Sequence, residues 1–210
     1  MKFLGLLFEG SFVTLQVFFL TLLFSLPLGL LVAFGRMSKY RLISGIVKLY
    51  IDIMRGTPLI LQLIIVYFAP YYLFELNIDR FIAAVAAFVL NYSAYFAEIF
   101  RGGIQSMPKG QYEAAEVLGF TRKQTFIRII LPQVLKRILP PISNEVITLV
   151  KDTALVQVLG VSELFRVAKN EASRISSVTP LFTAGVFYFV MNWIVTRVFH
   201  FTEKKLDYYR

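Results

Sequence analysis

Long apolar stretches alternate along the chain with short segments that carry most of the charge. No charged residue lies between Glu9 and Arg36, and this gap is long enough to cross a bilayer core, which needs roughly 20 apolar residues. Four further stretches are similar, although Gly56-Thr57-Pro58 interrupts the second and several polar residues enter the fourth. The pattern predicts five membrane spans, at residues 11–35, 45–74, 80–100, 138–158 and 178–197.

The composition agrees with a membrane protein. Hydrophobic residues make up 57% of the chain and charged residues only 17%, whereas soluble proteins carry about a quarter charged residues. We therefore expect an all-α integral membrane protein with one domain, residues 1–210. There is no cysteine and only one histidine, His200, so the sequence offers no disulfide, no metal site and no histidine-based catalysis.

The positions of the basic residues predict an orientation. Cytoplasmic loops of membrane proteins are enriched in lysine and arginine. Four basic residues follow the first span, seven lie between residues 101 and 137, and four lie at the carboxyl end, whereas the other side has Lys2 and Arg80. Four more lie between the fourth and fifth spans and weaken this bias without reversing it: Lys151, Arg166, Lys169 and Arg174. This distribution places the amino terminus outside and the carboxyl terminus inside. It also accounts for the net charge of +9 without a nucleic acid partner.

The loop at residues 101–132 is polar and carries the spaced pattern E-A-A-x3-G-x9-I-x-L-P, which begins at Glu113. Ala114 and Ala115 leave little side-chain bulk, so another surface can approach the backbone closely. Gly119 suits the end of a short helix, because glycine readily adopts the left-handed conformation that closes one. We predict a short helix here that docks on a cytoplasmic partner.

This pattern resembles the signature loop of the permease subunits of ABC importers. Three further stretches carry the same resemblance and are similar to the branch for polar amino acids: Arg55-Gly56-Thr57-Pro58, residues 91–106 (NYSAYFAEIFRGGIQS) and Lys151-Asp152-Thr153-Ala154-Leu155. The resemblance extends from about residue 11 to about residue 205. It implies a type I importer permease fold with about five membrane helices and a cytoplasmic coupling helix.

The resemblance also implies partners. A dimer of ATPase subunits would hold the coupling helices, which here comprise Glu113, Ala114, Ala115 and Gly119. A second permease chain, as a homodimer, would complete the pathway in the bacterial plasma (inner) membrane. An external binding protein would deliver the amino acid. No G-x-x-x-x-G-K-[ST] phosphate loop occurs, so ATP and magnesium are expected in the partner subunit, with no cofactor in this chain and no enzymatic activity of its own.

Ionisable residues within membrane spans often mark a substrate pathway. Glu163 is the first candidate to meet a cationic substrate, because it follows the apolar turn Leu159-Gly160-Val161. An outer-surface pair of Glu163 with Arg166 is the alternative, and segment 161–177 lies either in the membrane or outside it. The other substrate-binding candidates are Glu145, Asp152, Asn91, Tyr92 and Thr148. A surplus of carboxylates favours basic amino acids: arginine, lysine or histidine.

Other function classes explain less of the sequence. A secondary transporter or channel driven by an ion gradient could use a buried carboxylate as a proton site, but it leaves the E-A-A pattern unexplained. An intramembrane enzyme lacks a nucleophile–base pair. Two acid–arginine pairs at helical spacing, Asp52 with Arg55 and Glu98 with Arg101, are expected to be structural ion pairs.

Overall fold

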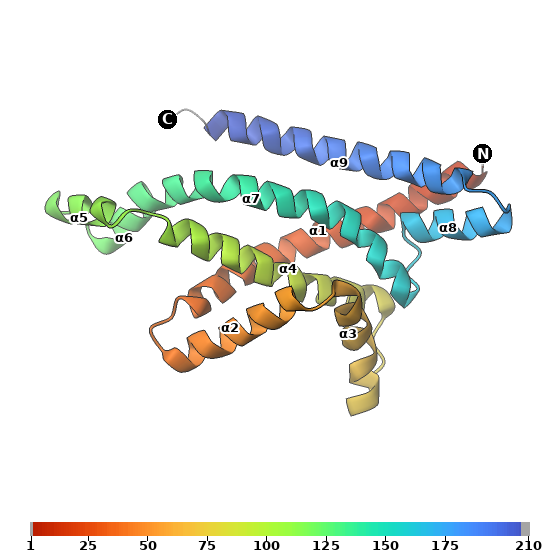
Figure 1. The fold of residues 1–210 in the computed structure, drawn as a ribbon, viewed down its shortest axis with the longest axis horizontal. Helices are drawn as coiled ribbons and strands as arrows, with labels where there is room; N and C mark the ends of the chain where they lie inside the picture. Colours follow the sequence, from red (N-terminus) through yellow and green to blue (C-terminus); the bar gives the residue numbers. More distant parts are fainter. Residues whose placement is uncertain (1, 207–210) are drawn as a thin grey trace.

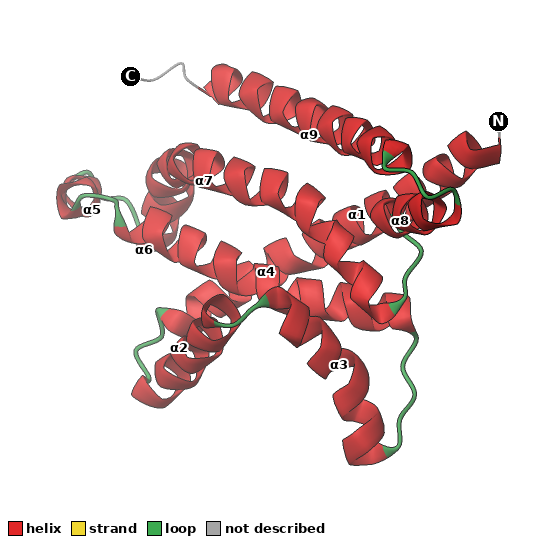
Figure 2. Ribbon diagram, turned by 45° about the vertical axis from the view of Figure 1, so that its right-hand side comes forward, coloured by secondary structure: helices red, strands yellow, loops and turns green. Residues whose placement is uncertain are grey.

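The computed structural model describes residues 2–206, and every regular element within them is a helix (Figures 1 and 2). This confirms the predicted all-α class. The elements are α1 (Lys2–Arg36), α2 (Arg41–Gly56), α3 (Leu59–Phe74), α4 (Arg80–Gln105), α5 (Lys109–Val117), α6 (Arg122–Gln124), the π-helix η1 (Thr125–Ile130), α7 (Leu131–Asp152), the 3₁₀ helix η2 (Thr153–Leu159), α8 (Leu164–Arg174) and α9 (Thr179–Leu206).

The long helices α1, α4, α7 and α9 run along the longest axis of the molecule (Figure 1). The short helices α5 and α6 lie at one end of this bundle, whereas α8 lies at the other end beside the start of α1. Helix α1 starts and helix α9 finishes toward opposite ends of the bundle, with the last turn of α9 toward α5 and α6. This arrangement suits the predicted placement of the two termini on opposite sides of a membrane.

Three helices among the described residues are long and apolar enough to cross a membrane: Phe3–Arg36, Arg80–Gln105 and Thr179–Lys205. They contain the predicted first, third and fifth spans. The predicted second span, 45–74, is two helices, α2 and α3, which meet at a bend of 113° and could form a fourth crossing together. The predicted fourth span, 138–158, falls on α7 and η2, which do not meet the same criterion. The count of five spans therefore stays a prediction.

The bend between α2 and α3 has a local cause in the sequence. Thr57 is extended, with ψ of 150°, because the ring of Pro58 disfavours the helical conformation in the residue before it. Pro58 then stands immediately before the first turn of α3, where its missing N–H leaves no helical bond unmade. The dipeptide thus ends one helix and permits the next to start in a new direction.

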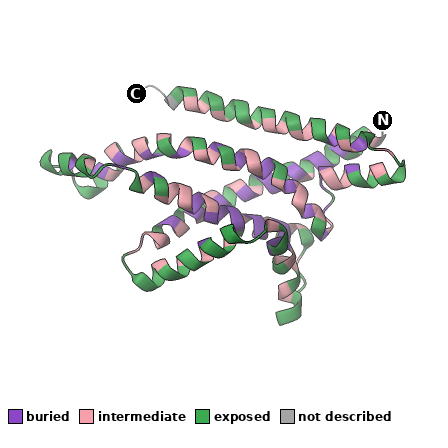
Figure 3. Ribbon diagram, viewed as in Figure 1, coloured by how far each residue is buried: buried purple, intermediate pink, exposed green. Residues whose placement is uncertain are grey.

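The main core lies where α1, α3, α4, α7 and η2 meet (Figure 3). Helix α1 approaches α4 closely at Gly29, where an added Cβ would lie 2.9 Å from the Cβ of Phe96 and 3.0 Å from the carbonyl oxygen of Ser93. Both Phe96 and Ser93 are fully buried. Helix α9, in contrast, exposes most of its surface (Figure 3). The core thus fixes α1 and α4 as one rigid pair.

Candidate functional site

Two buried amides stabilise the bend between α2 and α3. The Nε2 of Gln62 donates to the carbonyl oxygens of Met54 (3.0 Å) and Thr57 (3.2 Å) and to the Thr57 hydroxyl (2.8 Å). Asn91 on α4 donates through Nδ2 to the same Met54 oxygen (3.0 Å) and to Oε1 of Gln62 (2.9 Å). A broken helix within a membrane protein needs such partners, because unpaired backbone groups are costly there. Asn91, a predicted substrate contact, therefore has a structural role beside the bend.

Tyr92 and Asp152 join α4 to α7. The Tyr92 hydroxyl donates to Oδ2 of Asp152 at 2.8 Å, and the Tyr92 ring stacks on the buried ring of Phe88. Glu145, two turns earlier on α7, lies within electrostatic range of both Tyr92 and Asp152. Thr148 lies between the two acids on α7 and is half-buried. The structure therefore joins Tyr92 to Asp152 and places Glu145 within electrostatic range of both, and their contact with a substrate stays a prediction.

Glu163 is fully buried, and both of its carboxylate oxygens accept hydrogen bonds from the protein itself. One carboxylate oxygen accepts hydrogen bonds from the backbone N–H of Phe165 (2.6 Å) and from the Tyr188 hydroxyl (2.9 Å), and the other accepts from the N–H of Arg166 (2.7 Å). Glu163 thus caps α8 and connects it to α9. In this arrangement its oxygens are not presented to a ligand, so Asp152 and Glu145 are the better placed carboxylates.

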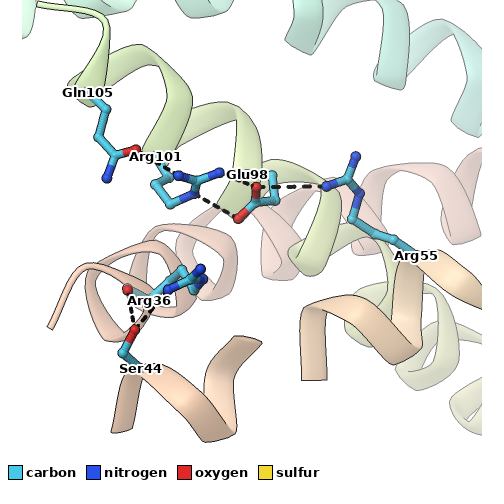
Figure 4. Close-up of polar contacts among 6 residues, drawn as sticks. All are labelled: Arg36, Ser44, Arg55, Glu98, Arg101 and Gln105. Carbon is cyan, nitrogen blue, oxygen red and sulfur yellow. Dashed lines mark hydrogen bonds and ion pairs between the residues drawn. The ribbon is translucent and has the colours of Figure 1, made fainter. Parts of the chain in front are cut away.

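A second polar cluster lies toward the end of the bundle that holds α5 and α6 (Figure 4). Glu98 accepts from Nε (2.9 Å) and Nη2 (2.6 Å) of Arg101, which confirms the predicted pair. The predicted pair of Asp52 with Arg55 is wrong. Instead, Nη1 of Arg55 lies 3.9 Å from Oε2 of Glu98, and the guanidinium group lies over the ring of Tyr95. Arg55 is drawn across to α4 because Glu98 and the Tyr95 ring together attract a guanidinium. The cluster therefore links α2 to α4.

The predicted coupling segment forms a short helix, α5, as expected. Ala115 is buried, whereas Glu113, Ala114 and Gly119 are exposed. Gly119 has φ of +77° and its N–H donates to the Glu116 carbonyl oxygen at 2.9 Å, so it ends the helix in the left-handed conformation.

Two apolar residues that closely precede Gly119, Val117 and Leu118, are exposed to solvent. Val117 is 89% exposed and Leu118 is 73% exposed, at the tip of a polar loop. Neighbouring exposed apolar side chains at such a position are typical of a protein-binding surface.

Sequence reasoning missed Gln62 and Tyr188. Gln62 carried a signal, because it is the one amide in the apolar stretch LILQLIIVYF and an isolated polar residue there needs a partner. Tyr188 carried none, since an aromatic residue in an apolar span gives no indication of what its hydroxyl will meet.

Comparison with known proteins identifies relatives over nearly the whole length. Residues 25–208 match the family described as binding-protein-dependent transport system inner membrane component. The chain is 37% identical to the L-cystine transport system permease protein TcyB of Bacillus subtilis, over 99% of this chain and 89% of that protein. It is 40% identical to the arginine transport system permease protein ArtQ of the same species, over 94% and 91% of the two chains. A solved structure described as an amino acid ABC transporter with histidines superposes with a TM-score of 0.90 and 36% identity, covering 97% of this chain and 95% of that one.

Proposed function

The chain belongs to the family of binding-protein-dependent transport system inner membrane components, and we propose that it forms the membrane pathway of an ATP-driven importer for basic amino acids. Its fold is that of a type I ABC importer permease. The chain is a permease subunit and not itself an enzyme, because in this family ATP hydrolysis belongs to a separate subunit. The family assignment favours an ATP-driven importer over a transporter driven by an ion gradient.

The cluster of Tyr92, Asp152 and Glu145 supports a basic substrate. Its two carboxylates lie close enough to interact electrostatically. Arg55 acts on Glu145 and Lys151 acts on Asp152, but among residues 2–206 neither acid forms an ion pair within 4.0 Å. A cationic side chain bound at this cluster would reduce the repulsion between the two acids and could form the direct ion pair that they lack. The substrate classes named for relatives include both cystine and arginine, so the carboxylates are what favours a cation here.

The complete transporter is proposed to hold two copies of this chain. Helix α9 exposes most of its apolar surface, and one chain provides few helices to enclose a pathway. Each copy would dock α5 on one ATPase subunit, and an external binding protein would deliver the amino acid. ATP binding would then bring the ATPase subunits together and move α5, which changes access to the cluster of Tyr92, Asp152 and Glu145.

We expect Asp152→Asn to reduce transport of basic amino acids. The substitution keeps the shape of the side chain and its contact with Tyr92 but removes the charge. A hydrogen bond to a charged group contributes about 1.5–3 kcal/mol, so apparent affinity for arginine and lysine should fall roughly tenfold or more. The measurement is ATP hydrolysis by the complex in proteoliposomes, stimulated by arginine, lysine, histidine, glutamine or cystine with the binding protein present.

The matched control is Glu171→Gln, which removes a partly buried carboxylate that is paired with Arg174 on α8. This variant should respond as the wild type does, and basal ATP hydrolysis should persist in both variants. Equal stimulation of the wild type by glutamine and by arginine would refute the preference for basic amino acids while leaving the amino acid importer in place. If arginine stimulates ATP hydrolysis equally well in Asp152→Asn, then Glu145 rather than Asp152 recognises the charge of the substrate. Glu145→Gln tests this alternative.

The proposed orientation is tested by cysteine labelling, for which the absence of native cysteines is convenient. Ser106 at the end of α4 and Asn77 between α3 and α4 are both exposed. We expect Ser106→Cys to react with a membrane-impermeant maleimide only after the cytoplasmic side is opened, and Asn77→Cys to react in intact cells. The reverse pattern would invert the proposed topology, and labelling of both from one side would contradict the path of α4 across the membrane.

A further inference from the structure

Two arginines from distant parts of the chain converge beside Gly160. Gly160 ends η2 with φ of +85°, and the point where its Cβ would lie is 2.8 Å from Nη1 of Arg80 and 2.8 Å from Nη1 of Arg166. The two guanidinium nitrogens are therefore no farther apart than twice that distance. Arg80 begins α4 and Arg166 lies in the first turn of α8. A Cβ here would collide with both groups, so the absence of a side chain at Gly160 is what allows the two guanidinium groups to approach its Cα together.

The neighbouring carboxylates are already engaged elsewhere. Asp79, next to Arg80, accepts through Oδ1 from the backbone N–H groups of Phe81 (2.9 Å) and Ile82 (3.1 Å). Glu163 attracts Arg166 electrostatically, but its two oxygens accept the three hydrogen bonds described above. Both acids therefore serve as helix caps.

Among residues 2–206, the two guanidinium groups form no ion pair, although Glu163 acts on Arg166 electrostatically. In the same part of the chain, Nη1 of Arg166 has no hydrogen-bond partner although the protein covers it. Two positive groups at this separation repel each other, and an oxyanion between them would reverse the sign of that energy. Guanidinium groups match carboxylates in geometry and bind them with charge-assisted hydrogen bonds.

We propose that Arg80 and Arg166, which converge beside Gly160, form a binding site for the α-carboxylate of the arriving amino acid. Arg80 is exposed at the end of α4 that we place outside, where substrate first reaches the chain. The site stands at one end of η2 and Asp152 stands directly before its other end, so about 14 Å of 3₁₀ helix separates them. This distance exceeds the reach of one amino acid, so the site at Gly160 is a separate entry site. The inference rests on the proposed amino acid import, but not on its preference for basic side chains.

Protection from an arginine-specific reagent tests the site directly. The full chain, in complex with its ATPase subunit in phosphatidylcholine nanodiscs, is treated with phenylglyoxal, and modification of each arginine is followed by peptide mass spectrometry. Two pairs of compounds are compared, L-lysine with L-lysinamide and L-glutamine with L-glutaminamide. The members of each pair share the same amine and differ at the carboxylate. We expect both acids to slow modification of Arg80 and Arg166, and both amides to leave it unchanged.

Matched variants assign the protection to the site. In Arg80→Gln, protection of Arg166 should require roughly tenfold more glutamine, because one of two charged donors is lost. Gly160→Ala should abolish protection by displacing both guanidinium groups, whereas Gly185→Ala on α9, with nothing within 4 Å of its Cβ, should not. Arg174→Gln removes a basic residue at the far end of α8 and should leave protection intact. Arg174 in the wild type is exposed and serves as an unprotected reference.

The outcomes separate this site from the proposed substrate preference. Equal protection by glutamine and lysine supports the site even if ATP hydrolysis proves to respond to neutral amino acids. Protection by the amides as well as the acids would overturn carboxylate recognition. Protection by inorganic phosphate and not by amino acids would make this a phosphate or lipid headgroup site instead. The absence of protection by any of these compounds would also overturn the proposal.

Discussion

In a Gly29→Val variant, we expect the yield of folded protein to fall roughly tenfold or more. The added Cβ would lie within about 3 Å of the Cβ of Phe96 and of the carbonyl oxygen of Ser93, and two further methyl groups would follow it. The carbonyl belongs to the backbone of α4, so relief requires that the two helices separate. Overpacking of a close contact costs typically 1–3 kcal/mol and occasionally more, and here it falls in the main core. The measurement is the monodisperse fraction of a fluorescent fusion after detergent extraction, together with its thermal unfolding midpoint.

Gly185→Val is the matched control for this prediction. Gly185 lies in the long apolar helix α9, and nothing lies within 4 Å of the position of its Cβ. The same substitution there should leave yield and unfolding midpoint close to the wild-type values. The yield and unfolding midpoint of Gly29→Ala should lie between those of Gly29→Val and those of the wild type. Wild-type behaviour of Gly29→Val would mean that α1 and α4 do not pack as closely as the structure describes.

A Val117→Asp variant should insert normally but lose its ATPase partner. Val117 is 89% exposed, so a carboxylate there costs the isolated chain little. At a docking surface the same carboxylate would be buried against a partner without a counter-charge, which costs several kcal/mol and lowers affinity by more than a hundredfold. Glu113→Lys should act in the same direction by reversing a charge on the same helix. The measurements are copurification of the ATPase subunit and amino acid uptake.

The glycines of the coupling segment provide a paired control. Gly119→Val forces a branched side chain into the left-handed conformation at the end of α5 and should weaken docking as well. Gly110→Ala lies in the same helix, also with nothing near its Cβ, and its φ is not positive. We expect it to retain the ATPase. Normal copurification and uptake in both Val117→Asp and Gly119→Val would show that α5 is not the coupling element.

The sequence predicted those features that depend on neighbours along the chain. Apolar stretches marked α1, α4 and α9, the Thr57-Pro58 step marked the interruption of the second span, and Gly119 marked the end of α5. The pair of Glu98 with Arg101 could be predicted because three residues of helix bring the two side chains to one face.

Contacts between distant segments could not be predicted in the same way. Asp52 and Glu98 are both acids that could pair with Arg55. Only the packing of α2 on α4 brings Glu98 close to it. Glu163 looked like a ligand-binding carboxylate because an acid after an apolar turn is unusual. The two backbone N–H groups and the Tyr188 hydroxyl that engage it become visible only in three dimensions. The sequence therefore indicated which polar residues need a partner inside the bundle but not which partner each one has.

The length of α1 makes this protein sensitive to membrane thickness. Its uncharged part, between Glu9 and Arg36, spans about 39 Å at 1.5 Å per residue, whereas a typical hydrocarbon core is about 30 Å thick. Such a mismatch is relieved by helix tilt or by local thickening of the bilayer. Because Gly29 packs α1 closely against α4, a change in the tilt of α1 would carry α4 with it and displace Tyr92 relative to Asp152. Lipid acyl-chain length is therefore expected to change the geometry of the proposed transport pathway without any contact between lipid and substrate.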